Sequence, residues 1–259
     1  MSVDISVKDR IATVVLNRPA ALNSIDPDMR KSWNEALQRI RSDVDIWVAI
    51  ITGAGERAFC TGSDLKKTMP RQVGFAQQQF GDAPPESLTA EMHRIDKPFI
   101  AAINGYAIGG GMEIALACDI RICSHTAQFG LSEVKVGSIP GTGGTQRLPR
   151  AIALSDAMLM LLTGDRVDAK EALDMRLVSK VVAPDELMPA ARAIAEKITC
   201  NAPLAVRAVK RLVRDGLDVP LPHALDMERC TFGLLYASED RIEGRNAFTE
   251  KRPPKYRGR

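Results

Sequence analysis

Short apolar runs rich in β-branched residues recur along the chain, and stretches of helical periodicity separate them. Runs of four to eight such residues, bounded by turn signals, are typical of buried strands, and their alternation with helices indicates an α/β protein. The predicted strands cover residues 11–16, 47–52, 99–103, 119–123 and 177–182.

Two helix starts are marked by capping residues. Asp26 precedes Pro27, a pair typical of an N-cap followed by the first helical position, and the helix they begin has apolar residues spaced by three or four. A second helix is predicted at Asp168, because Glu171 follows at the spacing of a capping box. The residues that the first helix is expected to bury are Met29, Trp33, Leu37 and Ile40.

The strand signal fades after about residue 184, and helical patterns dominate from there to the end. We therefore expect a core that contains the active site over residues 1–195 and a helical oligomerisation region over 196–259. Residues 69–85 combine adjacent prolines, glycines and a glutamine run without clear periodicity, which predicts a loop or a frayed helix.

Composition narrows the function classes. The chain has 259 residues and a formal net charge of only +3, with charges of both signs interspersed, so nucleic acid is not an expected partner. Its longest apolar stretch contains three glycines and a glutamate, and its N-terminus has no apolar core of a signal peptide. We expect neither secretion nor a membrane span.

The spacing of cysteines and histidines argues against structural metal sites and disulfide bonds. The five cysteines form no C-x-x-C pair, and four of them lie in contexts that suggest buried thiols, so we expect a reducing, cytoplasmic location. The three histidines show no metal-ligand spacing, and no metal site is predicted.

Three glycine-bearing segments carry the candidate chemistry, at 58–65, 104–119 and 129–150. In the second, three successive glycines follow a predicted strand and open an apolar helix with Glu113 in its first turn. A helix N-terminus presents unpaired N–H groups, which suit an anion that develops during a reaction, such as the enolate oxygen of a thioester. The same glycines would also permit tight helix–strand packing, and the residues alone leave both interpretations open.

Together these segments resemble the enoyl-CoA hydratase/isomerase (crotonase) family, and further matching landmarks lie at 17–26, 163–182 and 247–256. The resemblance extends in order over essentially the whole chain. It implies a crotonase-like spiral of repeated ββα units with a helical C-terminal region. It also implies a homotrimer or homohexamer, an acyl-CoA thioester as substrate, and no cofactor beyond the coenzyme A that the substrate carries.

The resemblance also assigns site residues. Glu113 and Glu133 fall where family hydratases carry their catalytic glutamates, and two carboxyls around one water can deprotonate that water and protonate the α-carbon. The oxyanion-hole donors would be the backbone N–H groups of Thr61 and Gly110. Gly141 would contribute a backbone N–H on the water side.

Coenzyme A contacts are implied at five further positions, the last two of which would reach the substrate of a neighbouring subunit. In chain order these are Lys66, Lys67, Phe232, Phe248 and Lys251. For each of them a solvated charge or a core side chain is the ordinary alternative. Residues 69–92 are expected to line the acyl pocket.

The sequence is also compatible with other functions. Retention of both glutamates favours hydration, or its reverse, over isomerisation, and the chain ending also resembles relatives that act on carnitinyl-CoA. A G-x-G-x-x-A pattern at 53–58 follows a predicted strand and raises a nicotinamide-dependent dehydrogenase as a rival, although no acidic residue lies where one should bind the ribose. A catalytically silent oligomeric scaffold is the non-enzymatic alternative.

Overall fold

The computed structural model describes residues 2–68 and 87–259, so the loop predicted over 69–85 lies outside the described residues. Its larger sheet has six strands in the order β1-β2-β3-β5-β7-β10, and only the β1–β2 pair is antiparallel. The five predicted strands all belong to this sheet, although the last is shorter than predicted. The strands are β1 (Val3–Lys8), β2 (Ile11–Leu16), β3 (Val48–Gly53), β5 (Phe99–Ile103), β7 (Ile120–Ser124) and β10 (Lys180–Val182).

A second sheet of four short strands lies beside the first, in the order β4-β6-β8-β9. After β3, β5 and β7 in the large sheet, the chain passes each time into a strand of the small sheet and then toward a helix. This alternation is the predicted spiral of ββα units. The strands are β4 (Ala58–Cys60), β6 (Tyr106–Ile108), β8 (Gln128–Gly130) and β9 (Val167–Asp168), and the helices after the first two are α3 (Ala90–Arg94) and α4 (Gly110–Ala117).

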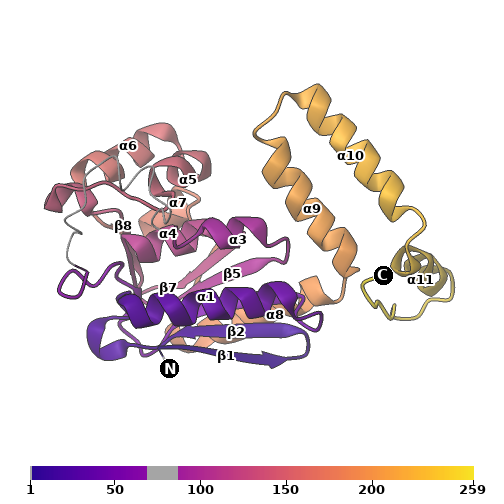
Figure 1. Cartoon of the computed structure of the whole chain (residues 1–259), viewed down its shortest axis with the longest axis horizontal. Coiled ribbons are helices and arrows are strands. Elements are labelled where there is room, and N and C mark those ends of the chain that lie inside the picture. Colours follow the sequence, from indigo (N-terminus) through magenta and orange to yellow (C-terminus); the bar gives the residue numbers. More distant parts are fainter. Residues whose placement is uncertain (1, 69–86) are drawn as a thin grey trace.

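Helices cover both faces of the large sheet (Figure 1). All six residues of β3 are buried, and successive ones point to opposite sides, as in a parallel sheet between two layers. On one side Ile50 packs in a cluster with Ala191 of α8 (Leu187–Thr199), and on the other Ile51 packs in the cluster of Trp33 from α1 (Pro27–Ser42).

Both predicted helix starts are confirmed. The carboxylate of Asp26 accepts a hydrogen bond of 2.9 Å from the Met29 N–H, and the four predicted apolar residues of α1 are buried. A full capping box joins Asp168 and Glu171 at the start of α7 (Ala169–Asp174). The other helical segments that the structure describes in the core are η1 (Pro19–Ala21), η2 (Glu133–Val136), α5 (Gly144–Ala151), α6 (Leu154–Thr163) and η3 (Pro184–Glu186).

The C-terminal helices project away from the two sheets (Figure 1). They are α9 (Pro203–Gly216), α10 (Leu221–Leu235) and α11 (Glu239–Thr249). Helix α8 runs through residue 195 and still packs on the sheet, so the projecting part begins at α9. The domain boundary at 195 stays a prediction.

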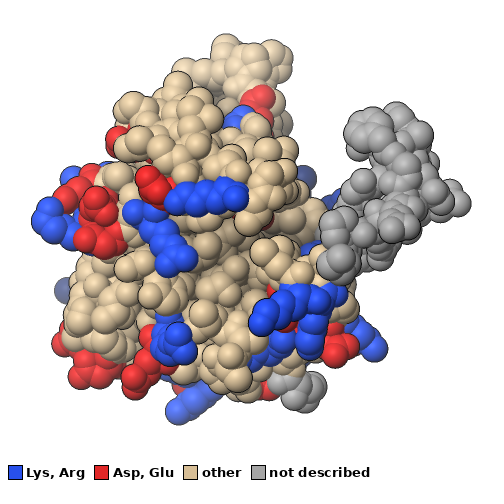
Figure 2. Space-filling view, turned by 90° about the vertical axis from the view of Figure 1, so that its left-hand side faces the viewer, with Lys and Arg blue, Asp and Glu red and all other residues tan. Residues whose placement is uncertain are grey.

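The distribution of surface charge agrees with the sequence-based expectation, whereas the burial of the cysteines agrees with it only in part. On the face shown in Figure 2, basic and acidic side chains lie interspersed around uncharged surface. Three thiols, rather than the predicted four, are buried, because Cys200 is exposed in the turn after α8 and Cys230 is exposed on α10; all five are free. No helix in the described part of the chain is long and apolar enough to cross a bilayer.

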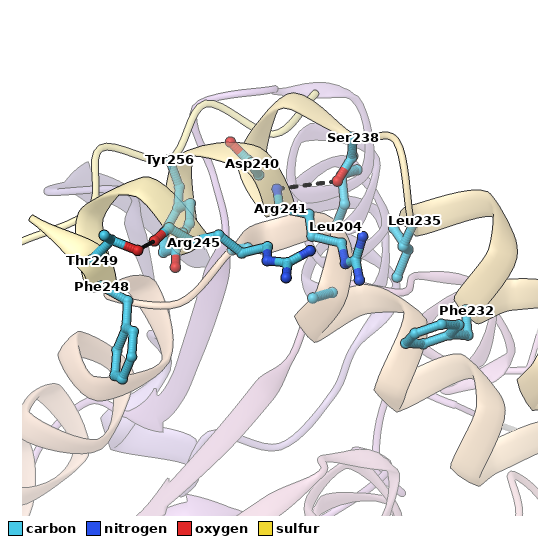
Figure 3. A pocket seen from close by; sticks show the side chains of 13 residues that line it. Leu204, Phe232, Leu235, Ser238, Asp240, Arg241, Arg245, Phe248, Thr249 and Tyr256 are labelled. Atoms are coloured by element: carbon cyan, nitrogen blue, oxygen red, sulfur yellow. Dashed lines mark hydrogen bonds between the residues drawn. The ribbon is translucent and has the colours of Figure 1, made fainter.

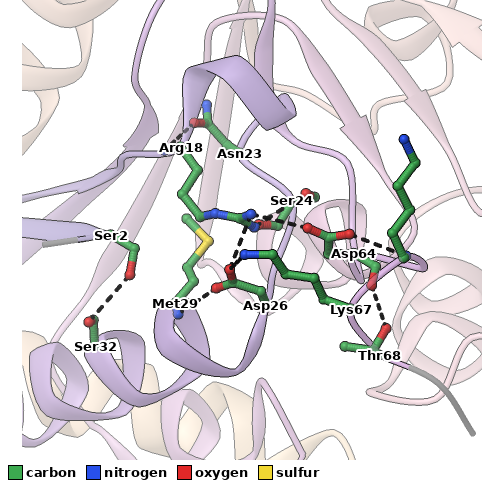
Figure 4. A network of polar contacts seen from close by, with 11 residues as sticks. Ser2, Arg18, Asn23, Ser24, Asp26, Met29, Ser32, Asp64, Lys67 and Thr68 are labelled. Atoms are coloured by element: carbon green, nitrogen blue, oxygen red, sulfur yellow. Dashed lines mark hydrogen bonds and ion pairs between the residues drawn. The ribbon is translucent and has the colours of Figure 1, made fainter.

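A polar network centred on the buried Asp26 joins the start of α1 to the segment that follows β4 (Figure 4). The Arg18 guanidinium lies 3.1 Å from a carboxylate oxygen of Asp26 and 3.1 Å from one of Asp64, and Lys67 Nζ lies 2.8 Å from Asp26. Burial alone raises the pKa of Asp26, but the hydrogen bonds from Lys67 and Met29 and the charges of Arg18 and Lys67 outweigh it, so the pKa lies below its usual value. The network therefore holds residues 61–67 against α1.

Replacing Arg18 with Met should lower the free energy of unfolding at pH 7 by about 1–3 kcal/mol, because Asp26 stays buried with one charged partner fewer. The folded-state pKa of Asp26 is depressed, so the native protein has this extra stability in full above the unfolded-state pKa of Asp26. The native protein loses it as pH falls through the folded-state pKa, and the difference from the variant should shrink over the same range. Urea unfolding at pH 7 and below pH 4 measures both effects. Arg39→Met, which removes an exposed ion pair, is the control and should change little; equal losses in the two variants would contradict the prediction.

Candidate active site

A cavity of about 380 Å³ opens where three parallel strands of the small sheet end. Segments just beyond the carboxyl ends of β4, β6 and β8 line it, which is the edge where α/β proteins place their ligands. Its lining is apolar apart from two glutamates, an arginine and a few hydroxyl groups. The lining residues are Arg30, Thr61, Gly62, Ser63, Leu65, Leu88, Ile108, Gly109, Gly110, Glu113, Ser132, Glu133, Val136, Ser138, Ile139, Gly141 and Thr142.

Close backbone packing defines one wall. A Cβ at Gly62 would lie 2.9 Å from the Gly110 nitrogen, and Gly62 has a φ of +80°, so this position requires glycine. Gly110 is the first residue of α4, and its N–H has no carbonyl partner within the helix. The Thr61 hydroxyl donates a 3.2 Å hydrogen bond to the Leu22 carbonyl. Thr61 and Gly110 thus come together at the cavity.

Glu113 is held by the loop before α5. Only 3% of the residue is exposed, and its Oε1 accepts hydrogen bonds from the N–H groups of Thr142 (2.7 Å) and Gly144 (2.9 Å). Its Oε2 accepts a third from the Thr142 hydroxyl, at 2.6 Å. Three donors and the N-terminal end of α4 therefore surround this carboxylate.

A second layer supports that loop. Arg147 donates hydrogen bonds of 2.9 Å to the Thr142 carbonyl and to the Thr89 hydroxyl, and Thr89 is fully buried. Burial lowers the pKa of Arg147, and the negative charge of Glu113 acts in the opposite direction. The Arg147 guanidinium therefore stabilises the loop through hydrogen bonds and interacts favourably with the negative charge of Glu113.

Glu133 has a different environment. Its Oε1 lies against Gly109, 3.3 Å from where a Cβ would stand, while its buried Oε2 accepts no hydrogen bond from any described residue. Burial raises the pKa of Glu133, and the charge of Glu113 raises it further. The protonated form of Glu133 is consequently favoured relative to an ordinary glutamate.

Five predicted site residues therefore meet in one cavity: Thr61, Gly110, Glu113, Glu133 and Gly141. The amides that bind Glu113 are those of Thr142 and Gly144, and a water-side role for the Gly141 N–H stays a prediction. Lys66 and Lys67 follow the cavity wall without lining it; Lys66 is exposed, and Lys67 pairs with Asp26.

The other predicted coenzyme A contacts lie on the projecting helices or, for Lys251, in the turn after α11. Phe232 and Phe248 stand on a groove between α9, α10 and α11, with Arg241 and Arg245 between them (Figure 3). Both rings are mostly exposed, at 60% and 87%. The structure does not bring them or Lys251 to the cavity within one chain.

Several residues that line or support the cavity had no individual prediction, among them Arg30, Thr142 and Arg147, whereas Leu88 falls in the segment that was expected to line the acyl pocket. The GTGG pattern at 141–144 marked the loop, but backbone donors leave no side-chain signal that could identify which amides face Glu113. Arg30 carried a weak signal, because a cation near the N-terminus of a helix opposes the helix dipole.

Comparison with known proteins agrees with this geometry. The model of the enoyl-CoA hydratase/isomerase family matches residues 6–259. The chain belongs to this family. It is 50% identical over 258 residues, covering 100% of both chains, to (E)-benzylidenesuccinyl-CoA hydratase of Thauera aromatica, and 40% identical over 243 residues to short-chain-enoyl-CoA hydratase of Clostridium acetobutylicum, covering 94% of this chain and 92% of that protein. An enoyl-CoA hydratase structure from Bacillus anthracis superposes with a TM-score of 0.93 at 38% identity over 100% of both chains.

Family membership and the structure also argue against a nicotinamide-dependent dehydrogenase. A dinucleotide-binding glycine pattern must open a helix directly after its strand. Here the pattern at 53–58 leads from β3 into β4 of the second sheet, and Gly53 is needed because a Cβ there would lie 2.2 Å from the Ala58 carbonyl oxygen. These glycines allow the chain to cross from β3 in the large sheet to β4 in the small sheet.

Thr142→Val should lower the free energy of unfolding by about 1–3 kcal/mol, because a buried carboxylate loses its hydroxyl donor while side-chain volume is kept. Thr142→Ser, which keeps the hydroxyl, is the matched control and should lose less. Urea denaturation of both variants measures the difference. If the serine variant is as unstable as the valine variant, the hydrogen bond to Glu113 is not the cause.

Proposed function

We propose that this protein is an enoyl-CoA hydratase, a hydro-lyase that adds water reversibly across the 2,3-double bond of an enoyl-CoA thioester. One observation carries the proposal. Two glutamates with contrasting environments, Glu113 and Glu133, share a cavity with the N–H at the start of α4. Such a set can stabilise an enolate and handle both proton transfers of a hydration.

The thioester carbonyl is assigned to the wall formed by Thr61 and Gly110. Their backbone N–H groups would donate to the carbonyl oxygen, and the donation strengthens as negative charge develops on that oxygen when water attacks C3. The α4 dipole adds to this effect. Because the glycines around them are tightly packed, these donors are oriented before substrate arrives.

Glu113 is assigned to the attacking water. Its oxygens are already oriented by Thr142 and Gly144, and the ionised carboxylate can accept a proton from a water that lies between it and C3. Glu133 is assigned to the α-carbon. Its raised pKa and its buried Oε2 without a described donor suit a carboxylic acid that delivers its proton to C2.

Hydration is favoured over isomerisation by the support given to Glu113. Moving a double bond requires one group that takes and returns a proton, and the isomerase branch usually lacks a carboxylate at the position of Glu113. Here three donors and Arg147 organise that carboxylate. The hydratase names of the relatives point the same way.

A homotrimer or homohexamer is part of the proposal. Phe248 and Lys251 are assigned to the site of a neighbouring chain, because neither residue lines the cavity of its own chain. The projecting helices also expose large apolar side chains that water alone would surround. These include Val209, Val213, Leu217, Leu221, Leu225 and Leu234.

The proposed enzyme needs no cofactor other than the coenzyme A of its substrate. A cytoplasmic location is proposed because all five thiols are free, which fits a reducing compartment.

Glu113→Gln and Glu133→Gln should each lower hydration turnover by about 10²–10⁴-fold, because each amide cannot take or give the proton assigned to its position. Loss of the conjugated enoyl absorbance of crotonyl-CoA measures turnover, and calorimetry with butanoyl-CoA checks that thioester binding persists. Near-native turnover in either variant would remove that glutamate from the mechanism.

Light scattering at micromolar concentration should give the mass of a trimer or a hexamer. Leu234→Asp places a charge on the exposed apolar face of α10 and should reduce that mass, because burying an unpaired charge in an interface is costly. Val44→Asp alters an equally exposed residue on the turn after α1 and should leave the mass unchanged. A stable monomer would exclude a neighbour's contribution to the site.

A further inference from the structure

The position of the Glu133 carboxyl depends on the backbone that carries it. Its buried Oε2 accepts no hydrogen bond from any described residue, and its Oε1 lies against the backbone of Gly109. The carboxylate is stabilised by a hydrogen bond from its own backbone N–H. A general acid must nevertheless stand within reach of the atom that it protonates. Whatever holds η2, the short helix that begins with Glu133, therefore also holds the proposed acid.

The turn that ends α6 supports η2. A 3₁₀ segment of four residues has few internal hydrogen bonds of its own, so its place depends on tertiary contacts. At its start, the Ser132 hydroxyl donates a 3.0 Å hydrogen bond to the carbonyl of Gly164, the C-cap of α6. Farther along, Lys135 Nζ lies 2.7 Å from a carboxylate oxygen of Asp165.

The same turn also packs closely against η2. Gly164 is buried and has a φ of +66°, and a Cβ there would lie 3.1 Å from side-chain atoms of both Val134 and Lys135. A side chain at this position would crowd η2 in addition to straining the backbone. Glycine at 164 therefore lets the end of α6 come close enough for its carbonyl to accept the bond from Ser132.

Of these polar contacts, the one from Ser132 is the more suited to hold Glu133. Lys135 and Asp165 are exposed, and an exposed ion pair contributes little because water screens it. Ser132 is half-buried, directly precedes Glu133 and bonds to a buried residue. Although Ser132 lines the cavity, its hydroxyl proton is directed to the end of α6.

The chain just before Ser132 is fixed to the other wall of the cavity. The Gly109 N–H donates to the Gly130 carbonyl at 2.9 Å, where β6 and β8 pair. The chain is thus held beside Gly109 and Gly110 at residue 130, and against α6 at residue 132. Because C2 is bonded to the thioester carbonyl carbon, the acid must keep a set distance from Gly110, and these two contacts define that distance.

We infer that Ser132 is a positioning residue for Glu133: its hydrogen bond to the Gly164 carbonyl fixes η2 to the end of α6 and so sets where the acid stands relative to Gly110. The inference rests on the proposed function, in which Glu133 protonates C2. It does not require the Ser132 hydroxyl to touch the substrate.

Ser132→Ala should lower kcat for crotonyl-CoA hydration by about 10- to 100-fold and leave KM nearly unchanged, because a small displacement of a reacting group slows the chemical step. Ser132→Thr keeps the hydroxyl and should restore most of the turnover. In a Glu133→Gln background, Ser132→Ala should have almost no further effect, because two changes that act through one group are not additive.

Ser42→Ala is the matched control. It removes a serine hydroxyl that also donates to a backbone carbonyl at 3.0 Å, on the exposed last turn of α1, and it should change neither kcat nor KM. Circular dichroism establishes that each variant folds. Ser132→Cys, whose thiol is only a weak donor, replaces the alanine variant if that variant does not fold.

Amide hydrogen exchange tests the contact without any turnover. The Ser138 N–H donates to the Glu133 carbonyl at 3.0 Å, so its exchange reports on how firmly η2 is held. Exchange at Ser138 should be faster in Ser132→Ala than in the native protein, and it should not change in Ser42→Ala.

Three results would overturn the inference: a raised KM with unchanged kcat, as loss of a direct substrate contact would give; an equal loss of turnover in the Glu133→Gln background; or unchanged exchange at Ser138. The native protein tests the hydratase function separately. Faster exchange in Ser132→Ala without native hydration of crotonyl-CoA or hex-2-enoyl-CoA would remove the hydratase function and keep the placement of Glu133 by Ser132. Native hydration with unaltered kcat in Ser132→Ala would do the reverse.

Discussion

Burial of the Glu113 carboxylate is the constraint on which the rest of the site depends. A charge with 3% exposure persists only if donors surround it, and the chain supplies them from a loop about thirty residues away, at Thr142 and Gly144. Bringing α4 within reach of that loop requires Gly111, because a Cβ there would lie 2.0 Å from the Cys60 carbonyl oxygen. The turn after β4, the start of α4 and the loop before α5 are therefore fixed by one carboxylate and by the backbone contact beside it.

That arrangement also explains how two identical side chains acquire different roles. Each glutamate follows a strand of the small sheet, but Glu113 faces donors whereas Glu133 faces Gly109 and the cavity. The ionised form of the first makes ionisation of the second less favourable, in addition to the effect of burial. The contrast between the two glutamates therefore comes from their hydrogen-bond donors rather than from residue type, and it suits the base and acid roles proposed for them.

Prediction from sequence succeeded where burial leaves a long periodic signal. Strand β3 is buried on both faces and α1 buries a stripe of five residues, so both were visible as apolar patterns. Strands β4, β6 and β8 have three residues each, too few to show a period, and the second sheet was implied only by the family resemblance. The glutamate pair followed from motifs, whereas the donors to Glu113 are mostly backbone groups, which sequence does not distinguish. Arg30 has the appearance of a solvated charge on an amphipathic helix until tertiary structure places it at the cavity.

Rigid coupling between α1 and the wall formed by Thr61 and Gly110 fixes this side of the cavity. Arg18 and Lys67 tie Asp26, the N-cap of α1, to residues 61–67, so α1 cannot shift without disturbing Thr61. The Ile25 N–H adds a backbone hydrogen bond of 2.8 Å to the Gly62 carbonyl at the same junction. The polar contacts that stabilise the start of α1 therefore also orient the backbone on which the proposed oxyanion hole depends.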